Sequence, residues 1–262
     1  MLSGVVGWQA VLASLSLVGL SLGLARWIGL RIEGEVATAA VRAAAQLLAV
    51  GFLFVAIFGS SAALLWAWLW IAIMTVVGTA TVTRRARHPI LGLPAAAWLA
   101  ILGSALLSIG VVFGMGVMDF TPVSLVVIAG ITIGNAVPST ALAVNQSVAL
   151  CRDRSGDVEA LLALGFDRPQ VMRFMAPQAA RSALIPQIDR TKVVGLIALP
   201  GALTGLLLAG AEPMEAVVTQ LLVMYLILGA TTICVVAGVT AVTRQVVSPA
   251  LTLADWARPG DR

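Results

Sequence analysis

Very few residues of this 262-residue chain have side chains that could perform catalysis or hold a metal. The one histidine, His88, lies beside Arg87 in a basic stretch, and the two cysteines, Cys151 and Cys234, lie far apart in apolar sequence. There is no phosphate-binding GxxxxGKS/T motif, no HExxH motif, and no nucleophile with a neighbouring general base. We therefore expect no enzymatic activity, metal site, bound cofactor or disulfide in this chain.

Polar side chains inside long apolar segments are the other candidates, because such groups are costly in lipid. Arg42 and Gln46 are four residues apart and share a helix face. They either line a transport pathway, or Arg42 snorkels to the membrane surface while Gln46 bonds a neighbouring helix. In the run GITIGNAVPSTALAVNQ, glycines and a proline favour a kink. Asn135, Ser139 and Thr140 there either line a pathway or form interhelical hydrogen bonds.

The longest polar interruption of the apolar sequence runs from Asp157 to Pro200 and predicts a docking element. Its first part is typical of a short helix, with Asp157 as N-cap and Gly165 as the residue that ends it. Leucines on this helix have no membrane span of their own to pack on, which favours burial in a partner. The predicted docking residues are Asp157, Glu159, Ala160, Leu161, Leu162, Leu164, Gly165 and Phe166.

A second short helix follows in the same segment. Asp167 precedes it, Pro169 lies near its start, and Pro177 is expected to end or redirect it. Farther on, Asp189 and Lys192 are spaced to form a local ion pair. Two short amphipathic helices separated by a glycine, next to a membrane span, are typical of a surface that docks a soluble partner.

The composition identifies an integral membrane protein. Hydrophobic residues make up 60% of the chain, charged residues only 11%, and the mean hydropathy is +1.03, whereas soluble domains carry roughly 25% charged residues. We predict an all-α polytopic protein with about seven spans, each near the length that crosses a bilayer. The expected spans are Val5–Ala25, Val36–Phe58, Ala62–Thr83, Pro94–Val117, Pro122–Leu150, Val193–Ala211 and Ala216–Thr243.

The basic residues set the expected orientation. They gather at residues 26–31, 84–87, 152–192 and 244–262, and only Arg42 falls inside a span. The intervening loops carry no lysine or arginine. The positive-inside rule then places the N-terminus outside and the C-terminus in the cytoplasm. Because the positive charges flank membrane spans, nucleic acid is not an expected partner. The tail at 244–262 ends in polar sequence expected to fray.

The sixth expected span carries small residues at helical spacing. Gly201, Gly205 and Ala209 form one face, which favours close packing against another helix within the chain or in a second copy. We treat residues 1–262 as one transmembrane domain, with a docking segment at about 152–190.

Several stretches together resemble one transporter family. EALLALG, from Glu159 to Gly165, followed by Pro177, is similar to the EAA motif of bacterial ABC importer permeases, with Leu161 in place of the second alanine. The runs AAQLLAVGFLFVAIF, ARSALIPQIDRTKVVGLIALPGALTGLLLAG and EPMEAVVTQLLVMYLILGA resemble the FetB-type family of iron-export permeases, which is related to plant aluminium-tolerance membrane proteins. The resemblance covers about Arg42 to Thr243.

The resemblance implies a homodimeric permease in the bacterial inner membrane, driven by two separate ATPase subunits that bind ATP and Mg. It also implies export or homeostasis of a metal. The alternative is an ion-coupled secondary transporter that works without an ATPase, which predicts inverted repeats and charged midplane residues.

Overall fold

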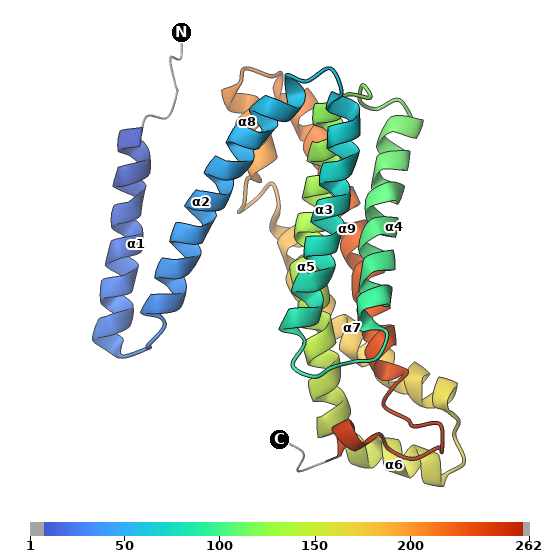
Figure 1. Ribbon diagram of the computed structural model, residues 1–262. Helices are drawn as coiled ribbons and strands as arrows, with labels where there is room; N and C mark the ends of the chain where they lie inside the picture. The colour runs from blue at the N-terminus through green and yellow to red at the C-terminus, as the bar shows by residue number, and fades with distance from the viewer. Residues whose placement is uncertain (1–7, 259–262) are drawn as a thin grey trace. The chain divides into compact units, whose positions relative to one another are not determined.

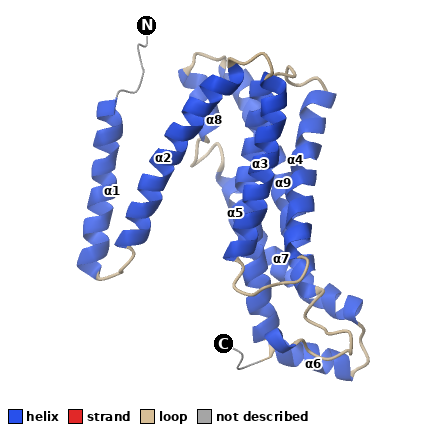
Figure 2. Cartoon of the chain, in the orientation of Figure 1, coloured by secondary structure: helices blue, strands red, loops and turns tan. Residues whose placement is uncertain are grey.

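The computed structural model describes residues 8–258, and these are almost entirely helical (Figure 2). The helices are α1 (Trp8–Ile28), α2 (Glu33–Phe58), α3 (Ala63–Arg85), α4 (Leu93–Gly114), α5 (Pro122–Asp153), α6 (Ser155–Ala163), α7 (Arg168–Val193), α8 (Gly201–Leu208) and α9 (Pro213–Thr243), followed by a 3-10 turn at Asp255–Ala257. No strand forms among the described residues, apart from two isolated bridges. The expected all-α fold is confirmed, although the start of the first expected span lies outside these residues.

The chain divides into two compact units, Met1–Ala63 and Leu64–Arg262. In the first unit, α1 and α2 form a helical hairpin whose turn contains Gly29 at φ +76°. Nearly all of the described side chains in this hairpin are exposed, and large apolar residues cover it. Such a surface is suited to lipid or to other helices.

The second unit is a bundle in which α9 packs most extensively against α5, with α3 and α4 alongside (Figure 1). Small residues allow the helices to approach closely. A Cβ added at Gly238 of α9 would lie 3.2 Å from Thr140 Cγ2 and 3.3 Å from Val144 Cγ2 of α5. A Cβ added at Gly78 of α3 would lie 2.8 Å from Val137 Cγ2. The bundle therefore depends on glycine at these contacts.

Five helices of the described chain are long and apolar enough to cross a membrane, namely α2, α3, α4, α5 and α9. The described side chains of α1 form a shorter apolar stretch, Leu12–Ile28. The long α5 remains helical through Pro138, so the run around Asn135 does not interrupt the helix. One end of the bundle is basic: α3 ends with Arg84 and Arg85, and α5 with Arg152 in its last turn.

The sixth expected span, Val193–Ala211, is wrong as a continuous helix. α7 ends at Val193, an irregular segment follows at 194–200, and α8 has only eight residues. Gly195 has φ +86°, and its N–H donates to the Ala198 carbonyl at 2.9 Å. Pro200, which lacks an N–H, directly precedes α8. Turn chemistry at Gly195 and Pro200 thus overrides the apolar character of this sequence.

Pro177 does not end a short helix, which corrects the second expectation for the docking segment. α7 runs for 26 residues and contains both Pro177 and Pro186. Ala179 and Ala183 of this helix are buried against Ala143 of α5 and against α9. Each proline removes a backbone hydrogen bond from α7. The helix nevertheless continues past both prolines, because burial of this face against α5 and α9 stabilises it.

The C-terminal tail does not fray as far as Arg258, contrary to expectation. Val246, Val247, Leu253 and Ala257 are buried in one cluster with Cys151 and other residues of α5, α6 and α7. Arg152 Nε donates to the Trp256 carbonyl at 2.9 Å. These four apolar residues give the tail a packing surface that its overall polarity concealed. Residues 259–262 lie outside the described part of the chain.

Candidate functional site

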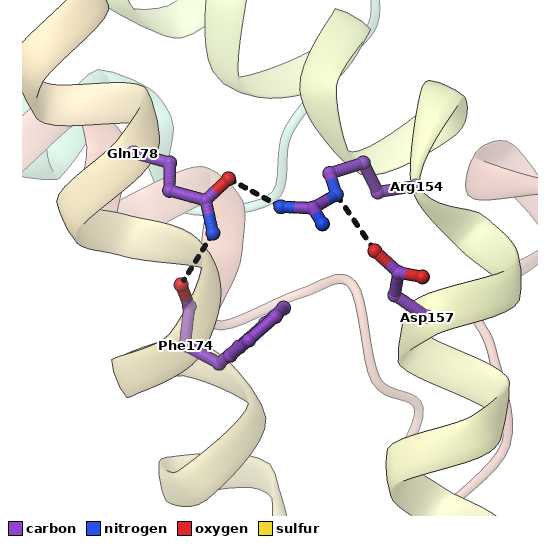
Figure 3. Close-up of polar contacts among 4 residues, drawn as sticks. All are labelled: Arg154, Asp157, Phe174 and Gln178. Atoms are coloured by element: carbon purple, nitrogen blue, oxygen red, sulfur yellow. Dashed lines mark hydrogen bonds and ion pairs between the residues drawn. The ribbon is translucent and has the colours of Figure 1, made fainter.

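Two regions of the second unit concentrate polar residues, and the first is the junction between α6 and α7, which we call the elbow (residues 154–178). Arg154 lies at its centre (Figure 3). Its Nε is 2.7 Å from Asp157 Oδ2, and its Nη1 donates to Gln178 Oε1 on α7. The guanidinium carbon also lies 5.5 Å from the centroid of the Phe174 ring. One side chain therefore ties α6 to α7.

The two ends of the elbow turn are capped, but not entirely as expected. Asp167 caps α7 through its Oδ1, which accepts from Gln170 N at 2.9 Å in a complete capping box. Gly165 adopts φ +87° and, with Phe166, closes α6 in a Schellman arrangement. The prediction that Gly165 ends the first helix is confirmed, and Asp167 precedes the second helix as expected. Asp157 is not the N-cap of α6, because Arg154 precedes the helix and the Asp157 carboxylate pairs with Arg154 instead.

The predicted docking residues divide into a buried and an exposed set. Leu161 and Leu162 pack against the cluster formed with the C-terminal tail, so their burial needs no partner and the reason given for their docking role is wrong. Leu164, by contrast, is 75% exposed. The other exposed members of the predicted set are Glu159, Ala160, Gly165 and Phe166. We call these five residues the elbow tip.

The second polar region is the break between α7 and α8. A cavity of about 450 Å³ lies there, bounded by α5, the end of α7, the irregular segment, the start of α8 and α9. Asn135 on its wall is thirteen residues into α5, about 20 Å along that helix at 1.5 Å per residue. Gln220 on the facing wall is seven residues into α9, about 10 Å. Both distances are shorter than the roughly 30 Å thickness of a hydrocarbon core.

The polar groups that line this cavity are Asn135, Gln187, Arg190 and Gln220. Gln220 Oε1 accepts from Leu203 N at 3.2 Å, and Asn135 Nδ2 donates to the Ile131 carbonyl at 2.8 Å. The Gln187 side chain is only 6% exposed and bonds no group in the described part of the chain. Its amide therefore faces the cavity, whereas the fully buried side-chain atoms without a partner in the described chain belong to Thr79, Gln146 and Thr231.

The structure separates the five predicted pathway residues. Asn135 lines the cavity, and Ser139 lies one turn farther along α5, with its hydroxyl donating to the Asn135 carbonyl at 3.2 Å. Thr140 is fully buried at the contact between α5 and α9 and donates to the Ala136 carbonyl. Arg42 and Gln46 lie in α2, in the other unit, and both are exposed.

Two of the three small residues expected to share one face, Gly201 and Gly205, lie on α8. Gly201 and Gly205 are exposed, and a Cβ added at either would meet no atom within 4 Å. Ala209 follows the last helical residue and is exposed too. No other described part of the chain covers this face, so its contact with a second copy remains a prediction.

Sequence reasoning missed Gln187, Arg190 and Gln220. Arg190 had been assigned to a basic loop beside the membrane, but the cavity that it lines also includes Asn135, midway along a span. The available signal was the run PQIDRTK, in which polar residues come directly before the glycine and proline of VVGLIALPG. Polar residues next to a helix-breaking pair inside an apolar region indicate a discontinuous span.

Five long apolar helices in the described chain, together with a discontinuous helix and a polar cavity at the discontinuity, define a multi-pass all-α membrane protein. The chain belongs to the family described as "Uncharacterised protein family (UPF0014)", whose model matches residues 8–247. No solved structure matches the chain.

Three relatives show the range of this family. The chain is 35% identical to the "UPF0014 membrane protein STAR2" of rice over 230 residues, covering 87% of this chain and 79% of that protein. It is 34% identical to the "Protein ALUMINUM SENSITIVE 3" of Arabidopsis thaliana over 223 residues, covering 84% and 80%. It is 31% identical to the "Probable iron export permease protein FetB" of Escherichia coli over 131 residues, covering 50% and 51%. The resemblance to FetB-type proteins and their plant relatives is confirmed.

Proposed function

We propose that the chain is the permease subunit of an ABC transporter, working as a dimer with two cytoplasmic ATPase subunits. The observation that carries the proposal is the continuity of α7. Its first turns belong to the elbow, and its last turns line the cavity at the break. A 26-residue helix extends about 39 Å. One continuous helix therefore connects an exposed apolar tip to a polar cavity within the bundle.

The elbow tip has the properties of a docking surface. Leu164 and Phe166 in the turn after α6 are exposed, while Val158 of α6 is fully buried and Arg154 fixes α6 to α7. A groove on the ATPase that receives these two side chains would pull or push on α7 as the ATPase dimer closes. Movement of α7 would then open or close the cavity at its other end, which is a lever mechanism for alternating access.

The proposed orientation of the protein in the membrane follows from the distribution of its basic residues. The elbow lies at the basic end of the bundle, where Arg84, Arg85 and Arg152 also lie. The positive-inside rule puts this end in the cytoplasm of a plasma (inner) membrane protein, with the N-terminus outside. ATP and Mg would be bound by the partner. The name of the FetB relative supports a metal-related cargo.

A co-purification experiment tests the ATPase partnership. The tagged chain is isolated from its native membranes, and the recovered ATPase is identified by mass spectrometry and by vanadate-sensitive hydrolysis of ATP. Leu164→Asp is expected to abolish recovery, because it places a charge where the partner buries a leucine. Leu91→Asp is the matched control, since Leu91 is 88% exposed in the α3–α4 loop at the same end of the bundle. Equal recovery with both variants, or no ATPase with the wild type, would contradict the proposal.

The alternative, a secondary transporter without an ATPase, has one observation in its favour. A helix broken at membrane depth beside a polar cavity is typical of ion-coupled transporters. Such proteins commonly carry a pair of broken helices in corresponding halves, whereas α2, α3, α4, α5 and α9 are continuous in the described chain. Transport by the purified chain alone in vesicles would favour this alternative.

A further inference from the structure

The cavity at the break carries charge of one sign. Arg190 is the only charged residue on its wall in the described chain, and the other polar side chains there are the amides of Asn135, Gln187 and Gln220. No carboxylate, histidine or cysteine lines it. The described residues also hold no group of three or more His, Cys, Asp and Glu side chains anywhere. A bare metal cation would find little here that it prefers as a ligand.

The start of α8 adds to the same charge preference. Pro200, Gly201 and Ala202 line the cavity, and no side chain caps the helix. The N–H groups of Gly201 and Ala202 bond no other described group, while Leu203 N donates to Gln220 Oε1. Free N–H groups at a helix N-terminus favour an anion.

The end of α7 also borders the cavity, and one of its last carbonyl groups is hydrogen-bonded within the chain. A helix C-terminus favours cations through its free carbonyl groups. Here the Val193 carbonyl accepts from Ile197 N at 3.0 Å and from Ala198 N at 3.3 Å. Arg190 supplies positive charge to the cavity from the last turn of α7, whereas Lys192 in the same turn does not line the cavity and pairs with Asp189. The charge on the cavity wall at this end of α7 is therefore that of a cation.

We infer that this cavity is the cargo site and that it binds a small organic anion through a carboxylate or phosphate group. The anionic group lies between the Arg190 guanidinium and the Gly201 and Ala202 N–H groups. The Gln187 amide, buried and without a protein partner, donates to the same ligand. Its role as cargo site rests on the proposed transport function. A metal carried by this protein would then travel as an anionic chelate.

Binding by the purified full-length chain tests the inference without any ATPase. Isothermal titration in nanodiscs of neutral lipid at low salt would use three probes: citrate, inorganic phosphate and Fe²⁺ alone. Citrate or phosphate is expected to bind, and which of the two binds more tightly distinguishes a carboxylate ligand from a phosphate ligand. Fe²⁺ binding with neither anion bound would overturn the inference.

Arg190→Gln tests the assigned contact. It should weaken binding of the anion roughly tenfold or more, the usual effect of losing a hydrogen bond to a charged group. Lys192→Gln is the matched control, because it removes the same charge from the same turn but Lys192 does not line the cavity and pairs with Asp189. Arg190→Lys should retain part of the affinity. Equal affinities for Arg190→Gln and Lys192→Gln would show that the guanidinium does not hold the anion.

Gln187→Leu separates a binding role from a structural one. Replacing a buried, unpartnered amide with an apolar side chain of similar size is expected to raise the thermal midpoint and weaken anion binding. A variant that loses stability and keeps full affinity would overturn the role given to Gln187. If anion binding depends on Arg190 but no ATPase co-purifies, the binding site stands and the proposed ABC function fails. Recovery of an ATPase without Arg190-dependent anion binding would reject the anion site alone.

Discussion

The elbow and the break lie at the two ends of α7 and differ in whether their polar groups are hydrogen-bonded within the chain. At the elbow, Arg154 contacts three residues, and Asp167 and Gln170 complete each other's capping bonds. At the break, Gln187 is buried without a partner in the described chain, and Gly201 N–H is free. Paired polar groups stabilise one geometry, whereas unpaired ones retain the capacity to bind something else. The comparison therefore assigns mechanical coupling to the elbow and ligand binding to the break.

The largest expected effect on stability comes from a substitution in the C-terminal tail, which packs against the elbow. Leu253 is buried in the cluster that also holds Val158 and Met175. Leu253→Asp would bury an unpaired carboxylate there, so we expect a loss of about 3 kcal/mol or more in stability and a clearly lower thermal midpoint. Leu251→Asp is the control, because Leu251 is 53% exposed and its φ of 58° is tolerated by aspartate. Similar midpoints for the two variants would show that the tail does not support the elbow.

A pair of glycine variants distinguishes packing within one chain from packing between copies. Gly238→Leu should destabilise the bundle by about 1–3 kcal/mol, because its Cβ would press on Thr140 and Val144. Gly205→Leu should leave the thermal midpoint of the monomer unchanged, because the space around Gly205 is open within the chain. It should instead reduce dimer formation, measured by light scattering. A fully dimeric Gly205→Leu protein would place this face toward lipid.

Arg154→Ala is expected to affect stability less than Gly238→Leu does. The ion pair with Asp157 is partly solvent-exposed, so its loss with the Phe174 contact should cost only about 1 kcal/mol. The coupling of ATP hydrolysis to transport should fall much more, because α6 would no longer move with α7. Lys192→Ala, which breaks a more exposed pair with Asp189, serves as the control for charge loss. Normal coupling in Arg154→Ala would mean that Arg154 does not transmit force.

Much of the fold could be predicted from the sequence because long apolar runs and helix caps are local signals. The bounds of α3, α4 and α9 agree with the expected spans within a few residues. Gly165 and Asp167 adopt the turn and cap geometry that their residue types favour. Local chemistry alone was sufficient in these places.

The remaining features depend on contacts between distant residues. Continuation of α7 past Pro177 depends on burial of Ala179 and Ala183 by α5 and α9, which no local pattern reveals. The fixed tail depends on Leu253 and Ala257 meeting Val158 and Met175. The cavity unites Asn135, Gln187 and Gln220 from three helices, and only Asn135 was predicted to line a pathway.

Chemical labelling of the irregular segment at 194–200 tests the central claim, that α7 links the elbow to the break. Leu196 is 91% exposed, and the two native cysteines are buried, so Leu196→Cys provides a single accessible thiol in the described chain. In the complex with its ATPase, trapping with ATP and vanadate should change the rate of maleimide labelling at this position severalfold. Adding Leu164→Asp at the elbow tip should abolish that change, while Leu91→Asp should preserve it. An unchanged labelling rate in a complex that hydrolyses ATP would contradict the coupling of the two regions through α7.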